Sequence, residues 1–123
     1  MDIHAFWDAV IRQDAQAIRL FFAPDAVIRW HCSNECFTVE EFIRANCEYP
    51  GRWAAEMERL TQTPDGLVTA MRVWPKDGEF SFHVASFFVL KNGLIHSLDE
   101  YWGDDAPAPQ WRRLMRIGSP IRL

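Results

Sequence analysis

The chain has 123 residues, of which 17 are acidic and 13 are basic, and its net charge at pH 7 is −4. This length allows one hydrophobic core, and the acidic balance argues against nucleic acid as a partner, because nucleic acid needs a basic face. No apolar run approaches the ~18 residues of a membrane span, so we expect no membrane partner either.

Helices are predicted first along the chain. Asp2 can cap a helix whose apolar residues recur at helical spacing, and this amphipathic start is not a signal peptide. Asp14 offers the cap of a second helix. Thr38 and Glu41 have the spacing of a capping box and open a third helix.

Three cysteines, Cys32, Cys36 and Cys47, follow the second predicted helix. They cannot all pair within one chain, which favours a reducing compartment, and we expect a cytoplasmic protein. Cys32 and Cys36 beside His31 could suggest zinc, but no second ligand pair with metal spacing occurs in the sequence. We therefore expect no metal and no cofactor.

The remaining elements are strands joined mostly by hairpins. Helices followed by consecutive strands predict an α+β domain, in which helices cover one face of a curved antiparallel sheet. We expect residues 1–123 to form this single domain, with 104–123 as an irregular strap. The predicted strands cover residues 26–31, 53–63, 66–75, 79–90 and 94–102.

Two Gly-containing turns, Asp77-Gly78 and Asn92-Gly93, should set the register of the last three strands. Counting outward pairs Arg72 with His83, His83 with Trp102, and Ala85 with Glu100. Side chains alternate between faces with a period of two. One face should then gather a cation, an imidazole and a carboxylate among apolar side chains, as in a binding or catalytic site: Arg72, Trp74, His83, Phe87, Leu98, Glu100 and Trp102.

By the same parity, an apolar set projects from the other side of the sheet. Helices cover only one face in so short a chain, so this set would meet water, and we expect a homodimer through the outer sheet face. The alternative is a monomer in which residues 104–123 cover the set. Its members are Met71, Val73, Phe82, Val84, Phe88, Ile95 and Tyr101.

Two stretches carry a resemblance to a known family, namely residues 22–28 (FAPDAVI) and the segment from Asn92-Gly93 to Glu100-Tyr101-Trp102. Over about residues 1–104 the chain resembles the nuclear-transport-factor-2-like superfamily, and within it the SnoaL-like group related to polyketide cyclases. The resemblance implies a cone-shaped α+β barrel, closed by N-terminal helices. Its concave face would hold a small hydrophobic molecule.

The resemblance also implies a site on the last strand. Family enzymes commonly place a catalytic carboxylate just before an aromatic pair, and Glu100 has this position. In the pattern of limonene epoxide hydrolase Arg72 would stand beside two aspartates, but the second is missing and His83 stands nearby instead. The acid and base of ketosteroid isomerase are not both matched.

Two functions follow from these residues. In the first, an enzyme transfers a proton on, or hydrates, a small carbonyl or cyclic compound, with Glu100 as base, His83 as partner and Arg72 for charge stabilisation. His31 or Trp30 would face the same pocket, since only one of the two can point inward. The pocket walls would be Trp30, Trp74, Phe87, Leu98 and Trp102.

In the second, a protein of the same fold binds a small molecule without catalysis or acts in a stress response, and the polar residues only stabilise the interior. An enzyme needs Glu100 and His83 within hydrogen-bond reach of each other in an open pocket. A binding protein should hold them in other contacts.

Overall fold

The three predicted helices are confirmed in the computed structural model, which describes residues 1–122. They are α1 (Ile3–Arg12), α2 (Ala15–Arg19) and α3 (Val39–Cys47). The carboxylates of Asp2 and Asp14 accept backbone N–H groups at the first two helix starts, and the capping box of α3 forms as predicted. These caps satisfy N–H groups that the first turn of a helix leaves without a partner.

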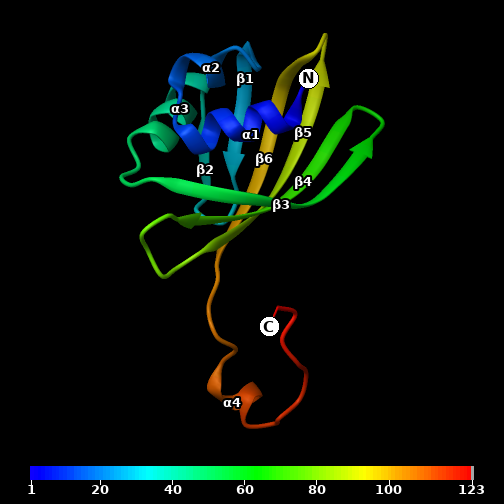
Figure 1. Cartoon of the computed structure of the whole chain (residues 1–123). Helices are drawn as coiled ribbons and strands as arrows, with labels where there is room; N and C mark the ends of the chain where they lie inside the picture. Colours follow the sequence, from blue (N-terminus) through cyan, green and yellow to red (C-terminus); the bar gives the residue numbers. More distant parts are fainter. Residues whose placement is uncertain (123) are drawn as a thin grey trace.

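Six strands form one curved sheet, in the order β2-β1-β6-β5-β4-β3. Neighbouring strands are antiparallel except β1 and β6, which are parallel. The α+β class is confirmed, but the sheet is open between its end strands rather than closed into a barrel (Figure 1). The sequence did not reveal β2. The strands are β1 (Phe22–Trp30), β2 (Glu35–Phe37), β3 (Trp53–Thr63), β4 (Gly66–Pro75), β5 (Phe82–Lys91) and β6 (Leu94–Asp104).

The helices α1, α2 and α3 cover one face of this sheet, which we call the inner face (Figure 1). Phe6 of α1 is fully buried between the two layers, and its ring meets four other rings edge-on at 5.4–5.9 Å. The apolar face of α1 thus packs on the sheet, as its helical periodicity requires. The opposite side of the sheet, the outer face, carries no helix of this layer.

The register of the last hairpin differs from the prediction. Asn92 and Gly93 both have positive φ, of 54° and 77°, and Lys91 faces Leu94 as expected. At the third residue of β6, however, a β-bulge leaves His96 without a partner on β5. The bulge shifts every later pair by one residue, and such a shift exchanges the two faces of a strand.

The bulge changes the neighbours of Glu100 and His83. Glu100 faces Ser86 rather than Ala85, and His83 faces Gly103 rather than Trp102. In the first hairpin Arg72 faces His83 as predicted. The loop is nevertheless longer than two residues, because β4 ends at Pro75 and β5 begins only at Phe82.

The expected outer apolar set is therefore mostly in the core. The prediction was wrong for six of its members, because they belong to the inner face under the helices; only Tyr101 projects from the outer face. These six are Met71, Val73, Phe82, Val84, Phe88 and Ile95, all of them buried except Phe82, which is half-buried.

After β6 the chain leaves the sheet as a tail, residues 105–122, which includes the short helix α4 (Gln110–Arg113). The tail hangs below the body and turns back toward it (Figure 1). Near its end Arg122 contacts Glu58 and His83. The expected strap does not cover the sheet: Trp111 and Leu114 are 64 % and 73 % exposed.

Among the helices of residues 1–122, none has the length and apolar character needed to cross a membrane.

Candidate functional site

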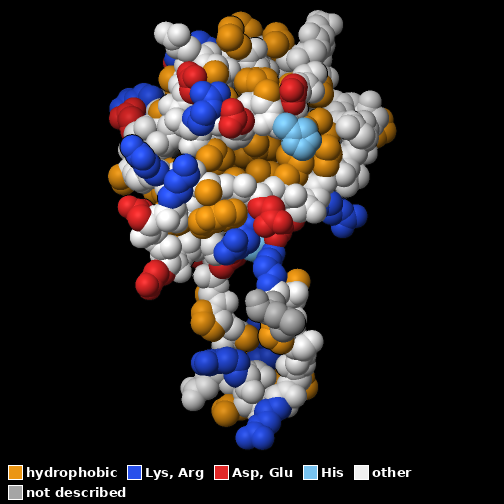
Figure 2. All heavy atoms as spheres, viewed as in Figure 1, with side chains coloured by type: hydrophobic (Ala, Val, Ile, Leu, Met, Phe, Trp, Pro, Cys, Tyr) orange, Lys and Arg blue, Asp and Glu red, His pale blue; other side chains and the backbone are white. Residues whose placement is uncertain are grey.

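A cavity of about 390 Å³ lies between the helices and the inner face of the sheet. Helices α1 and α3 form one side of it, and strands from both halves of the sheet form the other. Hydrophobic side chains are visible between the helix layer and β3 (Figure 2). Six aromatic side chains line the cavity: Trp7, Trp30, Tyr49, Trp53, Phe82 and Trp102.

Five of these rings form a continuous series. The ring centroids of Tyr49 and Trp53 are 5.0 Å apart, those of Trp53 and Phe82 6.0 Å, and those of Phe82 and Trp102 6.3 Å. Trp30 continues the series at 6.1 Å from Trp102. Angles of 36–86° separate successive ring planes, so both ring faces and ring edges border the cavity, as aromatic packing prefers.

The cavity also has a polar side. Glu35 of β2 and Asp104 of β6 line it, with Ser33, Asn46 and Gln13. The amide group of Gln13 donates hydrogen bonds to the backbone oxygens of Asn46 and Tyr49, both at 2.7 Å, and so fixes the segment after α3 against α1.

Glu100 lies behind this aromatic wall. Its side chain is 1 % exposed and does not line the cavity. Trp30 Nε1 donates a hydrogen bond to one carboxylate oxygen at 3.0 Å, and Ser86 Oγ donates to the other at 2.5 Å. Glu100 is thus a buried acid held by two donors.

Burial raises the pKa of Glu100 to about 7, because an apolar surrounding disfavours the charged form. The donors Ser86, Trp30 and Trp102 oppose this shift and do not cancel it. Trp102 Nε1 does so without a hydrogen bond of ordinary geometry: it is the one buried side-chain polar atom within residues 1–122 that lacks a partner.

Three of the predicted site residues meet at the inner face as a group. Trp30 and Trp102 line the cavity, and Glu100 lies behind them. Trp30, not His31, therefore faces inward. Leu98 is also on the inner face but is fully buried in the core away from the cavity lining.

Five predicted site residues do not reach the cavity, because the outer face carries them. Arg72 lies over the ring of Trp74 at 4.8 Å, and Phe87 is 45 % exposed. The prediction that Arg72, His83 and Glu100 share one face was wrong, since the β-bulge in β6 moves Glu100 to the other side. The five are His31, Arg72, Trp74, His83 and Phe87.

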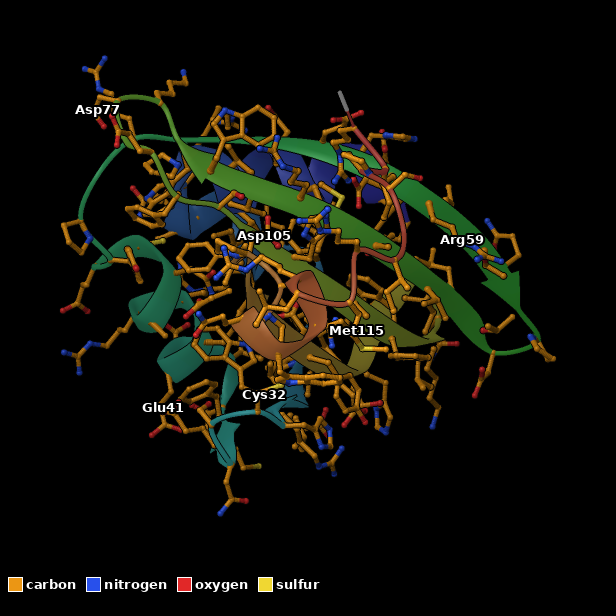
Figure 3. All side chains as sticks on the ribbon, turned by 90° about the horizontal axis from the view of Figure 1, so that it is seen from below. Cys32, Glu41, Arg59, Asp77, Asp105 and Met115 are labelled. Carbon is orange, nitrogen blue, oxygen red and sulfur yellow. The ribbon has the colours of Figure 1, made fainter. Side chains whose placement is uncertain are left out.

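His83 takes part in a separate charged cluster near the start of the tail. Its Nδ1 is 2.5 Å from Asp105 and its Nε2 is 3.0 Å from Glu58. The hydrogen bond with Asp105 raises the pKa of His83, and Glu58 adds to this effect against partial desolvation. Asp105 lies beneath the body, where the tail leaves the sheet (Figure 3).

His31 is held in a similar way on the other side of β6, just after β1. Its Nε2 is 2.7 Å from Asp99, and its ring stacks on Tyr101 at 4.4 Å with an interplanar angle of 9°. The two histidines thus have carboxylate partners on the outer face, and neither contributes to the cavity.

Sequence reasoning missed much of the cavity wall. Trp7 lies on α1 and Trp53 on β3, and the two predicted turns set the register of neither element. The predicted register placed Phe82 and Val73 on the outer face, whereas both line the cavity. Within residues 1–122 no three His, Cys, Asp or Glu side chains are grouped as metal ligands, and the three cysteines are free.

Solved structures with the same fold come from several bacteria. One from Kribbella flavida DSM 17836, provisionally named a ketosteroid isomerase, is 19 % identical with a TM-score of 0.80, and the alignment covers 98 % of this chain and 89 % of that one. A limonene-epoxide-hydrolase-like epoxide hydrolase of M. tuberculosis is 14 % identical with a TM-score of 0.66, covering 82 % and 79 %.

A third structure, from Catenulispora acidiphila DSM 44928, has a ketosteroid-isomerase-like fold and was solved in complex with trimethylamine. It is 15 % identical with a TM-score of 0.69, and the alignment covers 80 % of this chain and 82 % of that one. At such identities these structures show a shared fold, not a shared activity. No curated protein matches the chain. The family model described as the SnoaL-like domain matches residues 3–98, and the chain therefore belongs to the SnoaL-like domain family, with the nuclear-transport-factor-2-like fold.

Proposed function

We propose that this protein binds a small hydrophobic molecule in the aromatic cavity. The observation that carries the proposal is the cavity itself, about 390 Å³ in volume and lined by six aromatic side chains. Pockets for small molecules usually have volumes of ~300–1,000 Å³, with mostly apolar walls and a few polar groups. The complex of the Catenulispora acidiphila protein with trimethylamine is compatible with such a use of the fold.

The placement of the polar residues favours binding over catalysis by the predicted group. Arg72, His83 and His31 lie on the outer face, where carboxylates or a ring occupy them. Glu100 makes hydrogen bonds with Trp30 and Ser86 and has no direct opening to the cavity. Glu100 and His83 are thus held in separate contacts, as expected for a binding protein and not for an enzyme in which the two act together.

One observation keeps an isomerase-, cyclase- or hydrolase-like activity as the second candidate. The pKa of Glu100, raised by burial to about 7, is in the range that suits a general base near neutral pH. Such a reaction would require the Trp30 and Trp102 side chains to move aside. Turnover of cyclic ketones or epoxides that disappears in Glu100→Gln would support it.

Binding is tested with a panel of small apolar compounds and two matched variants on α3. Ala45 lines the cavity, whereas the neighbouring Arg44 side chain is 75 % exposed and does not. Ala45→Phe should place a large side chain in the cavity and abolish binding, and Arg44→Phe should bind like the original protein. Equal affinities in both variants would place any bound compound elsewhere.

We further propose a homodimer through the outer face of the sheet. Although most of the residues first expected there are in the core, Phe87 and Tyr101 are each 45 % exposed on this face. The tail adds Trp111, Leu114 and Met115, which are 55–73 % exposed. Exposed apolar surface on this scale commonly marks an interface, and two copies related by a two-fold axis would cover it.

Charge supports the same arrangement. All 17 acidic residues lie before residue 106, whereas the tail carries four of the 13 basic ones, Arg112, Arg113, Arg116 and Arg122. Basic and hydrophobic side chains are both visible on the tail (Figure 2). A basic, apolar tail is complementary to an acidic body. Arg122 already contacts Glu58 of its own body, so the part of the tail around Trp111 would lie against the partner. We also propose a cytoplasmic location, because the exposed Cys32 and Cys36 are free.

A further inference from the structure

We propose that the molecule bound in the aromatic cavity is a small organic cation, an amine or quaternary ammonium compound whose charged head lies against the ring faces. This inference rests on the proposed binding function and goes further by naming the charge of the ligand. Three features of the cavity carry it: its charged residues, the angles between its rings, and what lies behind those rings.

The charged residues of the cavity are all acidic. Glu35 and Asp104 line it, and among the lining residues there is no Lys, Arg or His. Neither carboxylate makes an ion pair with another residue of the part the structure describes. A bound anion would meet two uncompensated negative charges, whereas a cation would be attracted by them.

Register places these carboxylates beside the rings. Asp104 is directly opposite Phe82 on the neighbouring strand and two residues beyond Trp102, so all three lie on the inner face. Glu35 is directly opposite Trp30 on β1. Each carboxylate therefore lies next to an aromatic side chain of the wall, Glu35 beside Trp30 at one end of the ring series and Asp104 beside Phe82 in its middle.

Neighbouring rings of the cavity wall stand at steep angles to one another. The plane of Trp102 makes angles of 66° with Trp30 and 86° with Phe82, and Tyr49 is at 77° to Trp53. All five rings line the same cavity, and a cation within ~6 Å of the face of such a ring is attracted by the ring quadrupole. A planar neutral compound would instead favour parallel walls on which it could stack.

The group behind the rings increases their attraction for a cation. Trp30 donates its indole N–H to the Glu100 carboxyl at 3.0 Å, and whenever Glu100 is ionised this donor is polarised so that its ring becomes more electron-rich. Glu100 is fully buried and cannot reach the ligand itself. It acts as a positioning residue that orients the Trp30 ring.

The test compares two soluble probes of the same shape, choline and 3,3-dimethylbutan-1-ol, in which a carbon atom replaces the charged nitrogen. Isothermal titration of the full chain should give choline an affinity at least tenfold higher than that of the alcohol. Asp104→Asn should weaken choline severalfold and leave the alcohol unchanged, and Trp53→Leu should weaken choline more than it weakens the alcohol. Asp77→Asn and Trp74→Leu, outside the cavity, are the matched controls and should change neither.

The outcomes separate this inference from the function on which it rests. Equal affinities, or tighter binding of the alcohol, would overturn the inference while the cavity remains a hydrophobic binding site. The inference is also overturned, and the binding function kept, if neither probe binds while apolar compounds bind and Ala45→Phe abolishes their binding. If the apolar panel also fails, the proposed function falls together with the inference.

Discussion

Glu100 is a carboxylic acid held in the interior by one indole and one hydroxyl donor. Its burial costs free energy whenever it ionises, and the pKa of about 7 expresses this cost. In the unfolded chain the same group would ionise near the ordinary glutamate pKa of 4.5. The folded protein therefore holds a proton that the unfolded chain has lost between these two pH values.

This difference predicts a pH-dependent effect of Glu100→Gln. Between pH 4.5 and 7 the free energy of unfolding of the original protein should fall as pH rises, by roughly 3 kcal/mol in total at ~1.4 kcal/mol per pKa unit. The variant, whose amide does not titrate, should lack this component. Urea unfolding of both proteins at pH 4.5, 6 and 8 measures it.

The control is Ser86→Ala, which removes a donor but leaves the acid in place. Its unfolding free energy should fall more steeply with pH than that of the original protein, because the carboxylate loses a hydrogen bond made to its charged form. Parallel pH profiles for the original protein and Glu100→Gln would contradict the assigned environment of Glu100.

At the scale of elements, the sequence predicted well where the helices and strands lie along the chain. It predicted poorly which face of the sheet the side chains of β6 and its neighbours occupy. Predicted strands 53–63 and 66–75 agree with β3 and β4 to the residue, because turn residues and β-branched runs are local signals. Capping residues located the helices for the same reason. The two faces of β6 depended on one unpaired residue, His96, which local pairing rules do not reveal.

A signal of the bulge is nonetheless present in the sequence. Ile95 and Leu98 are both fully buried on the inner face although three residues separate them, an odd spacing that a regular strand would place on opposite faces.

Of the candidate site, Glu100, Trp102 and Leu98 were placed correctly on one face of the sheet. The sequence left open whether Trp30 or His31 faces inward, because the parallel pairing of β1 with β6 depends on long-range contacts. Arg72, Trp74, His83 and Phe87 were wrongly placed on the face of Glu100, because the register of β6 was wrong.

Adjacent residues of β5 test the corrected register. Val84 is 1 % exposed under the helices, whereas Ala85 projects from the outer face opposite Tyr101. Val84→Arg should reduce the free energy of unfolding by about 3–5 kcal/mol, because it leaves a charge without a partner in the core. Ala85→Arg should cost far less. Urea unfolding midpoints measure the loss of stability in the two variants. A larger loss of stability in Ala85→Arg than in Val84→Arg would contradict the observed register and support the one predicted from the sequence.

At the scale of the molecule, the tail is part of the fold that this chain shares with the Kribbella flavida structure, because the alignment covers 98 % of this chain and so continues past β6.

The proposed dimer through the tail and the outer face predicts a mass. If these surfaces bind a second copy, light scattering at micromolar concentration should give twice the 14.4 kDa mass of the chain. Phe87→Arg and Trp111→Ala should each shift the mass toward that of the monomer. Leu20→Arg, at an exposed apolar position in the helix layer, is the control.

A monomer mass for the original protein at these concentrations would refute the dimer. A dimer that Leu20→Arg disrupts and Phe87→Arg does not would place the interface on the helix side instead.

Occupation of the aromatic cavity by a small molecule can be measured directly, because the indole signals of the six tryptophans report on it. Trp7, Trp30, Trp53 and Trp102 line the cavity, whereas Trp74 and Trp111 lie outside it. In ¹⁵N-labelled protein, with the indole N–H signals assigned by single Trp→Phe variants, a bound small hydrophobic compound should shift the first four signals and leave the last two in place. Shifts confined to Trp74 and Trp111, or no shift with any compound of the panel, would contradict a binding site in this cavity.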